Sequence, residues 1–132
     1  MIMGGKIGSG QGGAYPFGAT VMDSGVFDGL LDIIGAEALT EVLDSCRRQF
    51  EDSQIEVAAV LGARDVMRLR HLTHDLKSSA LNIGLNELGS LARAIETACR
   101  ENRGQDALDL AEGLSERMAQ ACAVIKAIGS LH

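Results

Sequence analysis

The chain has 132 residues, which is enough for one modest domain with a single hydrophobic core. Apolar residues make up 46% of the sequence but aromatic residues only 3%, so we expect a core of Leu, Ile, Val and Ala, as in helical bundles. The formal net charge is −6, and the basic residues are not gathered into one stripe of the sequence. This pattern argues against a nucleic-acid partner.

No apolar run approaches the roughly 20 residues that a membrane-spanning helix needs, and the N-terminus lacks the hydrophobic stretch of a signal peptide. The three cysteines, Cys46, Cys99 and Cys122, are widely spaced and form no Cys-x-x-Cys pair. We interpret them as reduced core thiols, because neither a disulfide framework nor a zinc site is indicated. The sequence therefore predicts a soluble, cytoplasmic protein without membrane insertion.

Residues 1–22 contain seven glycines and no apolar period, which is typical of a flexible leader or linker. The segment from Gly8 to Gly13 fits the pattern G-x-G-x-x-G. A dinucleotide-binding site requires a strand before this pattern and a helix after it, and neither is indicated here. We expect no bound cofactor.

Residues 23–132 have a helical apolar period, and glycines stand where the helices should end. The predicted helices cover residues 24–34, 36–61, 64–83, 86–101 and 105–128. Gly35 and Gly84 are the expected stops, and Asn86 is a suitable N-cap. Short connections favour antiparallel neighbours, so the expected fold is all-α: an up-down antiparallel four-helix bundle with an additional short N-terminal helix. The expected inward positions on the other helices are Phe27, Leu30, Leu31, Ile34, Leu39, Leu43, Cys46, Phe50, Val57, Leu61, Leu88, Leu91, Ile95, Ala98, Leu108, Ala111, Leu114, Met118, Cys122 and Ile125.

The predicted helix over residues 64–83 has an unusual outer face. Its core stripe is formed by Leu69, Leu72, Leu76, Ala80 and Ile83. At 100° per residue His74 lies about 160° from Leu76, so its ring should stand in solvent. The same outer face holds Met67, His71, Ser78 and Leu81, with Arg70 and Lys77 at its side. This mixture of apolar, imidazole and small side chains indicates a docking surface, although scattered exposed apolar residues are also common and can mean nothing.

An exposed imidazole at this place could carry a phosphoryl group. A neutral imidazole nitrogen is nucleophilic near neutral pH and needs no further protein base. Lys77 lies one turn from His74, about 5–6 Å away between Cβ atoms, and could reach the phosphoryl oxygens. Ser78 is small enough to leave room for a partner. An i+3 lysine on a helix surface is, however, usually only solvated.

Residues 74–84 (HDLKSSALNIG) resemble the signature of histidine-containing phosphotransfer (HPt) domains, H-x-L-K-G-x-x-x-x-[LI]-G. The next helix begins as in that family, with Leu88, Leu91 and the pair Ile95-Glu96. The similarity in layout extends over about residues 24–130, and the sharp motif lies within residues 71–96. The sequence departs from the signature at Ser78, where the family usually has a glycine that admits the partner domain.

The resemblance implies that His74 is phosphorylated, that Lys77 assists the phosphoryl group and that Gly84 ends the helix. It also implies a phosphorelay role: a receiver-domain aspartate of a hybrid sensor kinase donates to His74, which passes the group to a response-regulator aspartate. The chain would have no kinase activity and no metal of its own, since magnesium would be held by the receiver domain. Met67, Arg70, His71, Ser78 and Leu81 would form the docking surface.

Three alternatives compete with this interpretation. A metal-binding bundle could use His71 and His74, but no Glu-x-x-His motif of the di-iron type occurs. A phosphorylation-independent interaction module would use the same exposed face. The dimerising helix of a sensor kinase would have Glu and Arg-Thr-Pro after its histidine and an ATPase domain, and neither is found. We expect a monomer, because the amphipathic helices can satisfy one another.

Overall fold

The computed structural model describes residues 22–131. Its helices are α2 (Ser24–Ala63), α3 (Val66–Asn82), α4 (Asn86–Arg100), α5 (Gly104–Ala111) and α6 (Leu114–Leu131). No strand occurs within the described residues. The predicted all-α class is therefore confirmed.

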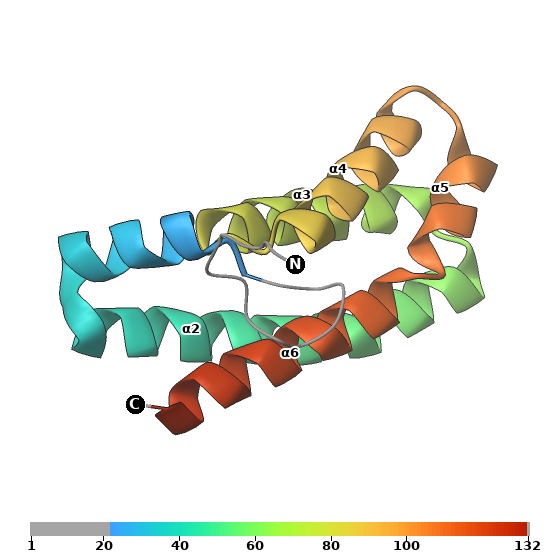
Figure 1. Cartoon of the computed structure of the whole chain (residues 1–132). Coiled ribbons are helices and arrows are strands. Elements are labelled where there is room, and N and C mark those ends of the chain that lie inside the picture. Colours follow the sequence, from blue (N-terminus) through green and yellow to red (C-terminus); the bar gives the residue numbers. More distant parts are fainter. Residues whose placement is uncertain (1–21, 132) are drawn as a thin grey trace, which may run out of the picture.

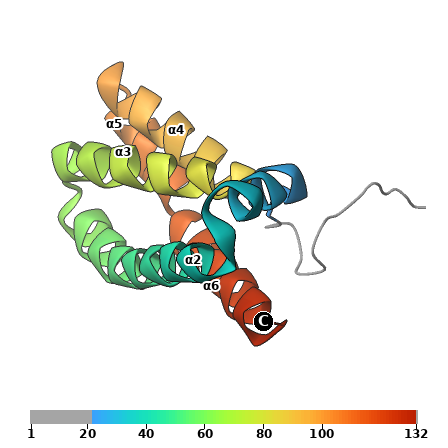
Figure 2. The same cartoon turned by 90° about the vertical axis from the view of Figure 1, so that its left-hand side faces the viewer.

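The helices pack in two layers (Figure 1). α3 packs mainly on α4, and the long part of α2 packs mainly on α6. The long part of α2 runs opposite to α3, α3 opposite to α4, and α4 opposite to α6, and α5 joins the upper layer to the lower one at one end (Figure 1). The turned view of Figure 2 shows α3 and α4 together above α2 and α6. The α3–α4 layer thus packs on the α2–α6 layer with one of its sides.

α2 is two helical segments joined at Gly35. Gly35 has φ 84° and ψ 165°, a backbone conformation that is essentially reserved for glycine, so the chain turns here as the sequence predicts. The first segment starts next to the turn that joins α3 to α4 and lies above the beginning of the long segment (Figure 1). Asp23 caps it by accepting from the Gly25 and Val26 backbone N–H groups, and its own N–H donates to the Gly84 carbonyl (2.7 Å). This bond fastens the start of α2 to the end of α3.

The core is aliphatic, as the composition indicates, and every member of the predicted stripe of α3 is buried in it. Two positions differ from the prediction. Ile34, expected to face inward, is 37% exposed, because it lies at the turn before Gly35. Met22 belongs to the predicted leader but is fully buried in the core, while residues 1–21 lie outside the described residues. The partly buried residues packed on the core are Leu30, Leu31, Cys46, Leu61, Val66 and Leu91.

Two further predictions about the helices are wrong. The single helix predicted over residues 105–128 is broken into α5 and α6, because the backbone N–H groups of Glu112 and Gly113 bond three residues back, to Asp109 and Leu110, and the helix axis changes there. Asn86 is not the N-cap of α4. Leu85 occupies that position without a side-chain cap, and the Asn86 amide donates to Asp23 Oδ2 instead.

Candidate functional site

α3 positions the candidate site by burying one side and exposing the other. Asp65 caps its N-terminus by accepting from the Arg68 backbone N–H (3.1 Å). The buried Thr73 hydroxyl donates to the Leu69 carbonyl one turn back and so needs no partner from outside the helix. His74, the next residue, has a side chain that is 61% exposed. The outward orientation predicted for this ring is therefore confirmed.

The exposed ring of His74 contacts a buried carboxylate on the neighbouring helix. His74 Nδ1 lies 2.7 Å from Glu96 Oε2 of α4. Lys77 Nζ, one turn further along α3, donates to the other oxygen, Glu96 Oε1, at 2.6 Å. One carboxylate thus bridges the two residues that the motif singles out. We call His74, Lys77 and Glu96 the phosphoryl site, after the role that the sequence resemblance implies for His74.

Glu96 is ionised in this arrangement. Its side chain is only 8% exposed, and burial by itself would favour the protonated form. The hydrogen bond from Lys77 is the strongest influence and lowers the pKa of Glu96 below its ordinary value, and the hydrogen bond with His74 acts in the same direction. The carboxylate is consequently charged and can only accept hydrogen bonds.

The tautomer of His74 follows from this contact. Because the Glu96 carboxylate can only accept, the proton of a neutral His74 ring must be on Nδ1, where it is donated to Oε2. The other ring nitrogen, Nε2, then keeps its lone pair. Since the side chain is mostly exposed, the site presents an oriented nucleophilic nitrogen to solvent.

The predicted docking residues divide into two groups. Met67, Arg70, His71 and Ser78 are exposed, and Met67 reaches 64% exposure. Leu81, also expected on the outer surface, is only partly exposed. It lies over Gly89 of α4, so closely that a Cβ atom at position 89 would collide with Leu81 Cδ2. Leu81 therefore belongs mainly to the α3–α4 contact.

Lys77 is closer to α4 than the sequence indicates. Its side chain is 25% exposed, and its ammonium group is held by Glu96 rather than standing free in solvent. A lysine has three N–H donors, so this ion pair leaves others for an incoming anion. The residue is therefore near enough to His74 to share one carboxylate with it.

Glu96 is the functional residue that the sequence interpretation misses. The resemblance includes this glutamate but assigns it no role. One signal is present in the sequence: a glutamate on a helix whose inward positions are apolar, directly after the buried Ile95. A charged residue at the edge of an apolar stripe usually has a partner when it is buried.

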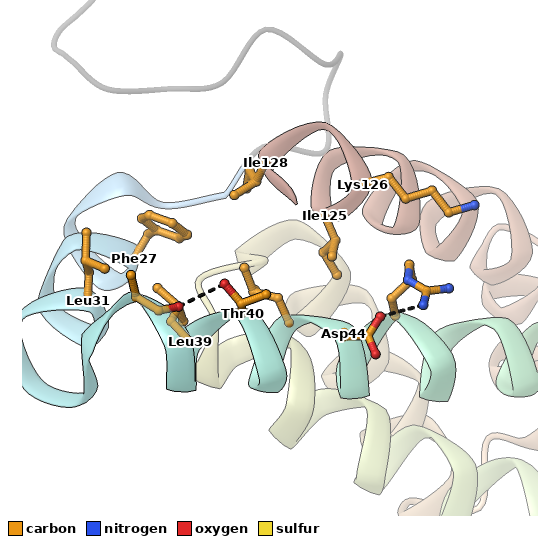
Figure 3. Close-up of a pocket in the computed structure, with 11 residues that line it drawn as sticks. Phe27, Leu31, Leu39, Thr40, Asp44, Ile125, Lys126 and Ile128 are labelled. Atoms are coloured by element: carbon orange, nitrogen blue, oxygen red, sulfur yellow. Dashed lines mark hydrogen bonds and ion pairs between the residues drawn. The ribbon is translucent and has the colours of Figure 1, made fainter. Parts of the chain in front are cut away.

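A cavity of about 210 Å³ lies apart from the phosphoryl site, between the two segments of α2 and the end of α6 (Figure 3). Its walls are mostly apolar, with Phe27, Leu39 and Ile125 among them, and Asp44 and Lys126 lie at its edge. None of the three residues of the phosphoryl site lines it.

Within residues 22–131 no group of three or more His, Cys, Asp or Glu side chains is placed to bind a metal ion. No described helix is long and apolar enough to cross a membrane.

Comparison with known families identifies the class of protein. The Hpt domain family matches residues 32–124, which is most of the chain and includes the whole phosphoryl site. The chain therefore belongs to the Hpt domain family. Its function is that of a phosphotransfer intermediate in the phosphorelays of two-component signalling. Members of this family are phosphoryl carriers rather than kinases, and they interact with receiver domains.

Among solved structures the chain is similar to histidine-containing phosphotransfer protein B (HptB) from Pseudomonas aeruginosa PAO1. The TM-score is 0.76 at 23% sequence identity, and the match covers 84% of this chain and 96% of that protein. At this level of identity the match shows a shared fold. No curated protein sequence matches the chain.

Proposed function

We propose that His74 is the phosphoryl-carrying residue, and that it accepts the group on Nε2 from a receiver-domain aspartate and passes it to the aspartate of a response regulator. One observation carries this assignment. His74 has an exposed ring whose inner nitrogen, Nδ1, is held 2.7 Å from the buried, ionised carboxylate of Glu96. The outer nitrogen is therefore the reactive one.

The transfer step balances without a further base. The Nε2 lone pair of His74 attacks the phosphorus of the aspartyl phosphate. The bond between phosphorus and the aspartate oxygen breaks, and the receiver carboxylate leaves with that electron pair. The proton on Nδ1 stays in place, so the phosphorylated ring carries a positive charge, which the Glu96 carboxylate stabilises at hydrogen-bond distance. Transfer to the next aspartate is the reverse reaction.

In this proposal the positive charge of Lys77 assists the transfer of the phosphoryl group. Its ammonium group shares Glu96 with His74, and its remaining N–H donors are available to the phosphoryl oxygens. Glu96 acts as a positioning residue, since it touches the ring but not the phosphoryl group. Ser78 is exposed one turn beyond His74, where it limits how closely a receiver domain approaches.

Several finer expectations remain proposals. We propose that α2, α3, α4 and α6 form an antiparallel four-helix bundle with the first segment of α2 as the additional helix, which the layer packing supports. We also propose that the chain acts as a monomer, that it needs no cofactor and no metal of its own, and that magnesium is bound by the receiver partner. Its cytoplasmic location and the leader role of residues 1–22 stay predictions.

The assignment is tested by phosphoryl transfer from a labelled receiver domain. Wild-type chain should acquire label that is stable in base and labile in acid, as expected of a phosphoramidate. The variant His74→Gln should acquire none. The matched control is His71→Gln, which removes an exposed imidazole three residues away and should still acquire base-stable label on His74. Only the rate of labelling should fall in this variant, because His71 belongs to the predicted docking surface. Label that persists in His74→Gln would contradict the assignment of His74 as the phosphorylated residue.

A further inference from the structure

The arginines of the described residues divide into two groups by their partners. Most of them have a side-chain partner: Arg47 and Arg48 pair with Asp44, Arg64 with Gln105, Arg68 with Glu56, Arg103 with Glu101, and Arg117 with Glu87. Three others, Arg70, Arg93 and Arg100, make no side-chain hydrogen bond or ion pair within residues 22–131. All three are exposed, and all three are on α3 or α4.

The register of α3 against α4 places these three arginines around the phosphoryl site. His74 of α3 lies opposite Glu96 of α4, and Leu81 of α3 lies opposite Gly89 of α4. Leu81 follows His74 by seven residues and Gly89 precedes Glu96 by seven residues, so the two helices are antiparallel in constant register. The same antiparallel register brings Arg70 level with Arg100, and Lys77 level with Arg93.

The positions on each helix also share one side. Arg70, His74, Lys77 and Leu81 follow one another on α3 at intervals of four, three and four residues, which keeps them on the side that faces α4. On α4, the same intervals connect Gly89 to Arg100 by way of Arg93 and Glu96. Burial raises the pKa of the Cys99 thiol and the Arg70 charge opposes this, which agrees with Arg70 lying beside the end of α4.

The charge of this face is opposite to that of the whole chain. The protein has a formal net charge of −6, with 18 acidic residues against 12 Lys and Arg residues. On the face around His74, Glu96 is neutralised by Lys77, and the three arginines have no carboxylate partner within the described part of the chain. Asp75 is the exposed acidic residue next to His74 in sequence, and it points about 100° away around the helix.

The spread of the arginines suits a protein partner better than a single phosphoryl group. Arg93 and Arg100 are seven residues apart on one helix, about 10 Å along its axis. One phosphoryl group has three terminal oxygens, which are too few acceptors for Lys77 and the forked donors of three arginines together. Carboxylates distributed around the rim of a docked domain can contact both ends of this span, and Arg binds carboxylates well because of its forked donors.

We infer that Arg70, Arg93 and Arg100 form a cationic rim that recognises carboxylates on the receiver domain around its phosphorylated aspartate. This inference rests on the proposed function, since it assigns the rim to the partner that exchanges phosphoryl groups with His74. The rim selects acidic receivers and speeds their association. Lys77 and Glu96 orient the chemistry at the centre, whereas the rim determines which partner arrives and how fast.

The test measures the rate of phosphoryl transfer from isolated, phosphorylated receiver domains of the same organism, chosen to differ in acidity around the aspartate. We expect the second-order rate constant with acidic receivers to fall steeply as salt is raised from low to high concentration. The triple variant Arg70→Gln, Arg93→Gln, Arg100→Gln should be about tenfold slower than wild type at low salt, with little remaining salt dependence.

The matched control replaces the same number of charges elsewhere, in the variant Arg48→Gln, Arg117→Gln, Lys126→Gln, whose residues lie on α2 and α6 in the other layer. This variant should transfer at close to the wild-type rate. Circular dichroism of both triple variants verifies that each is folded. The lifetime of the isolated phosphorylated chain should be the same with and without the rim.

Three outcomes overturn the inference: equal rates for both triple variants, no preference for acidic receivers, or an altered phosphohistidine lifetime as the sole effect of removing the rim. The last would mean that the arginines bind the phosphoryl group itself. Failure of the proposed function gives a different result, because wild-type chain would then accept no label from any receiver at any salt concentration.

Discussion

The carboxylate of Glu96 determines how the ring of His74 is presented. A solvent-exposed histidine without a partner exchanges its proton between two nitrogens and rotates freely, so its reactive nitrogen is not defined. Here Glu96 holds Nδ1, and Lys77 holds Glu96. The phosphoryl site is therefore a short chain of charge-assisted hydrogen bonds that crosses from α3 to α4 and back.

The buried charge of Glu96 makes stability depend on pH. Its pKa is lowered in the folded state, first by the Lys77 hydrogen bond and then by the one with His74, so the unfolded chain binds the proton more tightly. The stabilisation is present above the ordinary value of 4.5 and is lost as the pH falls through the lower, folded value. We expect Glu96→Gln to be less stable than wild type by about 1–3 kcal/mol at pH 7.

Urea unfolding at a series of pH values checks this expectation. The difference between wild type and Glu96→Gln should shrink as the pH falls below 4.5, because the wild-type carboxylate is then protonated as well. A difference that stays constant down to about pH 3 contradicts the role given to the ionised carboxylate. Asp75→Asn, at an exposed neighbour of His74, is the control and should have little effect at any pH.

At the scale of helices, the close approach of α3 and α4 places Glu96 within reach of His74. Gly89 permits this approach, because the Leu81 side chain occupies the space where a Cβ atom would be. The close contact lies seven residues from the Glu96–His74 bond along each helix, on the same side of both. A change in helix spacing at Gly89 is therefore transmitted to the phosphoryl site.

We predict that Gly89→Ala destabilises the fold by about 1–3 kcal/mol, because Leu81 or α4 must move. It should also slow phosphorylation of His74 by lengthening the contact with Glu96. Gly29→Ala is the matched control, since Gly29 lies inside α2 and a Cβ atom added there would meet nothing within 4 Å. That substitution should stabilise the protein by about 0.5–1 kcal/mol. Thermal unfolding and transfer rates of both variants, measured side by side, check the prediction, and equal behaviour would contradict the role of Gly89.

The helices and the exposure of His74 could be predicted from sequence because both depend on local periodicity. The inward stripe of α3 and the turn at Gly35 are examples. The break at Glu112 and Gly113 could not, since Leu108, Ala111, Leu114 and Met118 keep a helical period across it and are all buried. The spacing of apolar residues shows which side of a helix faces the core, but it does not show where the helix axis changes direction.

Contacts between helices could not be predicted from a single sequence. The Glu96 bridge, the position of Leu81 over Gly89 and the rim of Arg70, Arg93 and Arg100 all depend on the register of α3 against α4. In the sequence the basic residues are scattered and form no stripe. Antiparallel packing brings three of them to one face, which the linear pattern conceals.

At the scale of the whole molecule, the layer of α2 and α6 supports the layer of α3 and α4, whose outer side holds His74. The long part of α2 and α6 form the lower layer, and the turn between α5 and α6 returns the chain to it (Figure 1). α3 and α4 rest on this layer with their apolar sides and present His74 outward. An acidic molecule with a basic face around its reactive residue is suited to brief, electrostatically guided encounters with acidic partners.

The position of the phosphoryl group within the chain tests the central claim most directly. Nuclear magnetic resonance of uniformly ¹⁵N-labelled, phosphorylated protein distinguishes the two ring nitrogens of each histidine and shows which one is bonded to phosphorus. We predict a single phosphorylated species, with phosphorus on Nε2 of His74 and the proton retained on Nδ1 toward Glu96. Phosphorus on Nδ1 of His74, or on His71, would contradict the account.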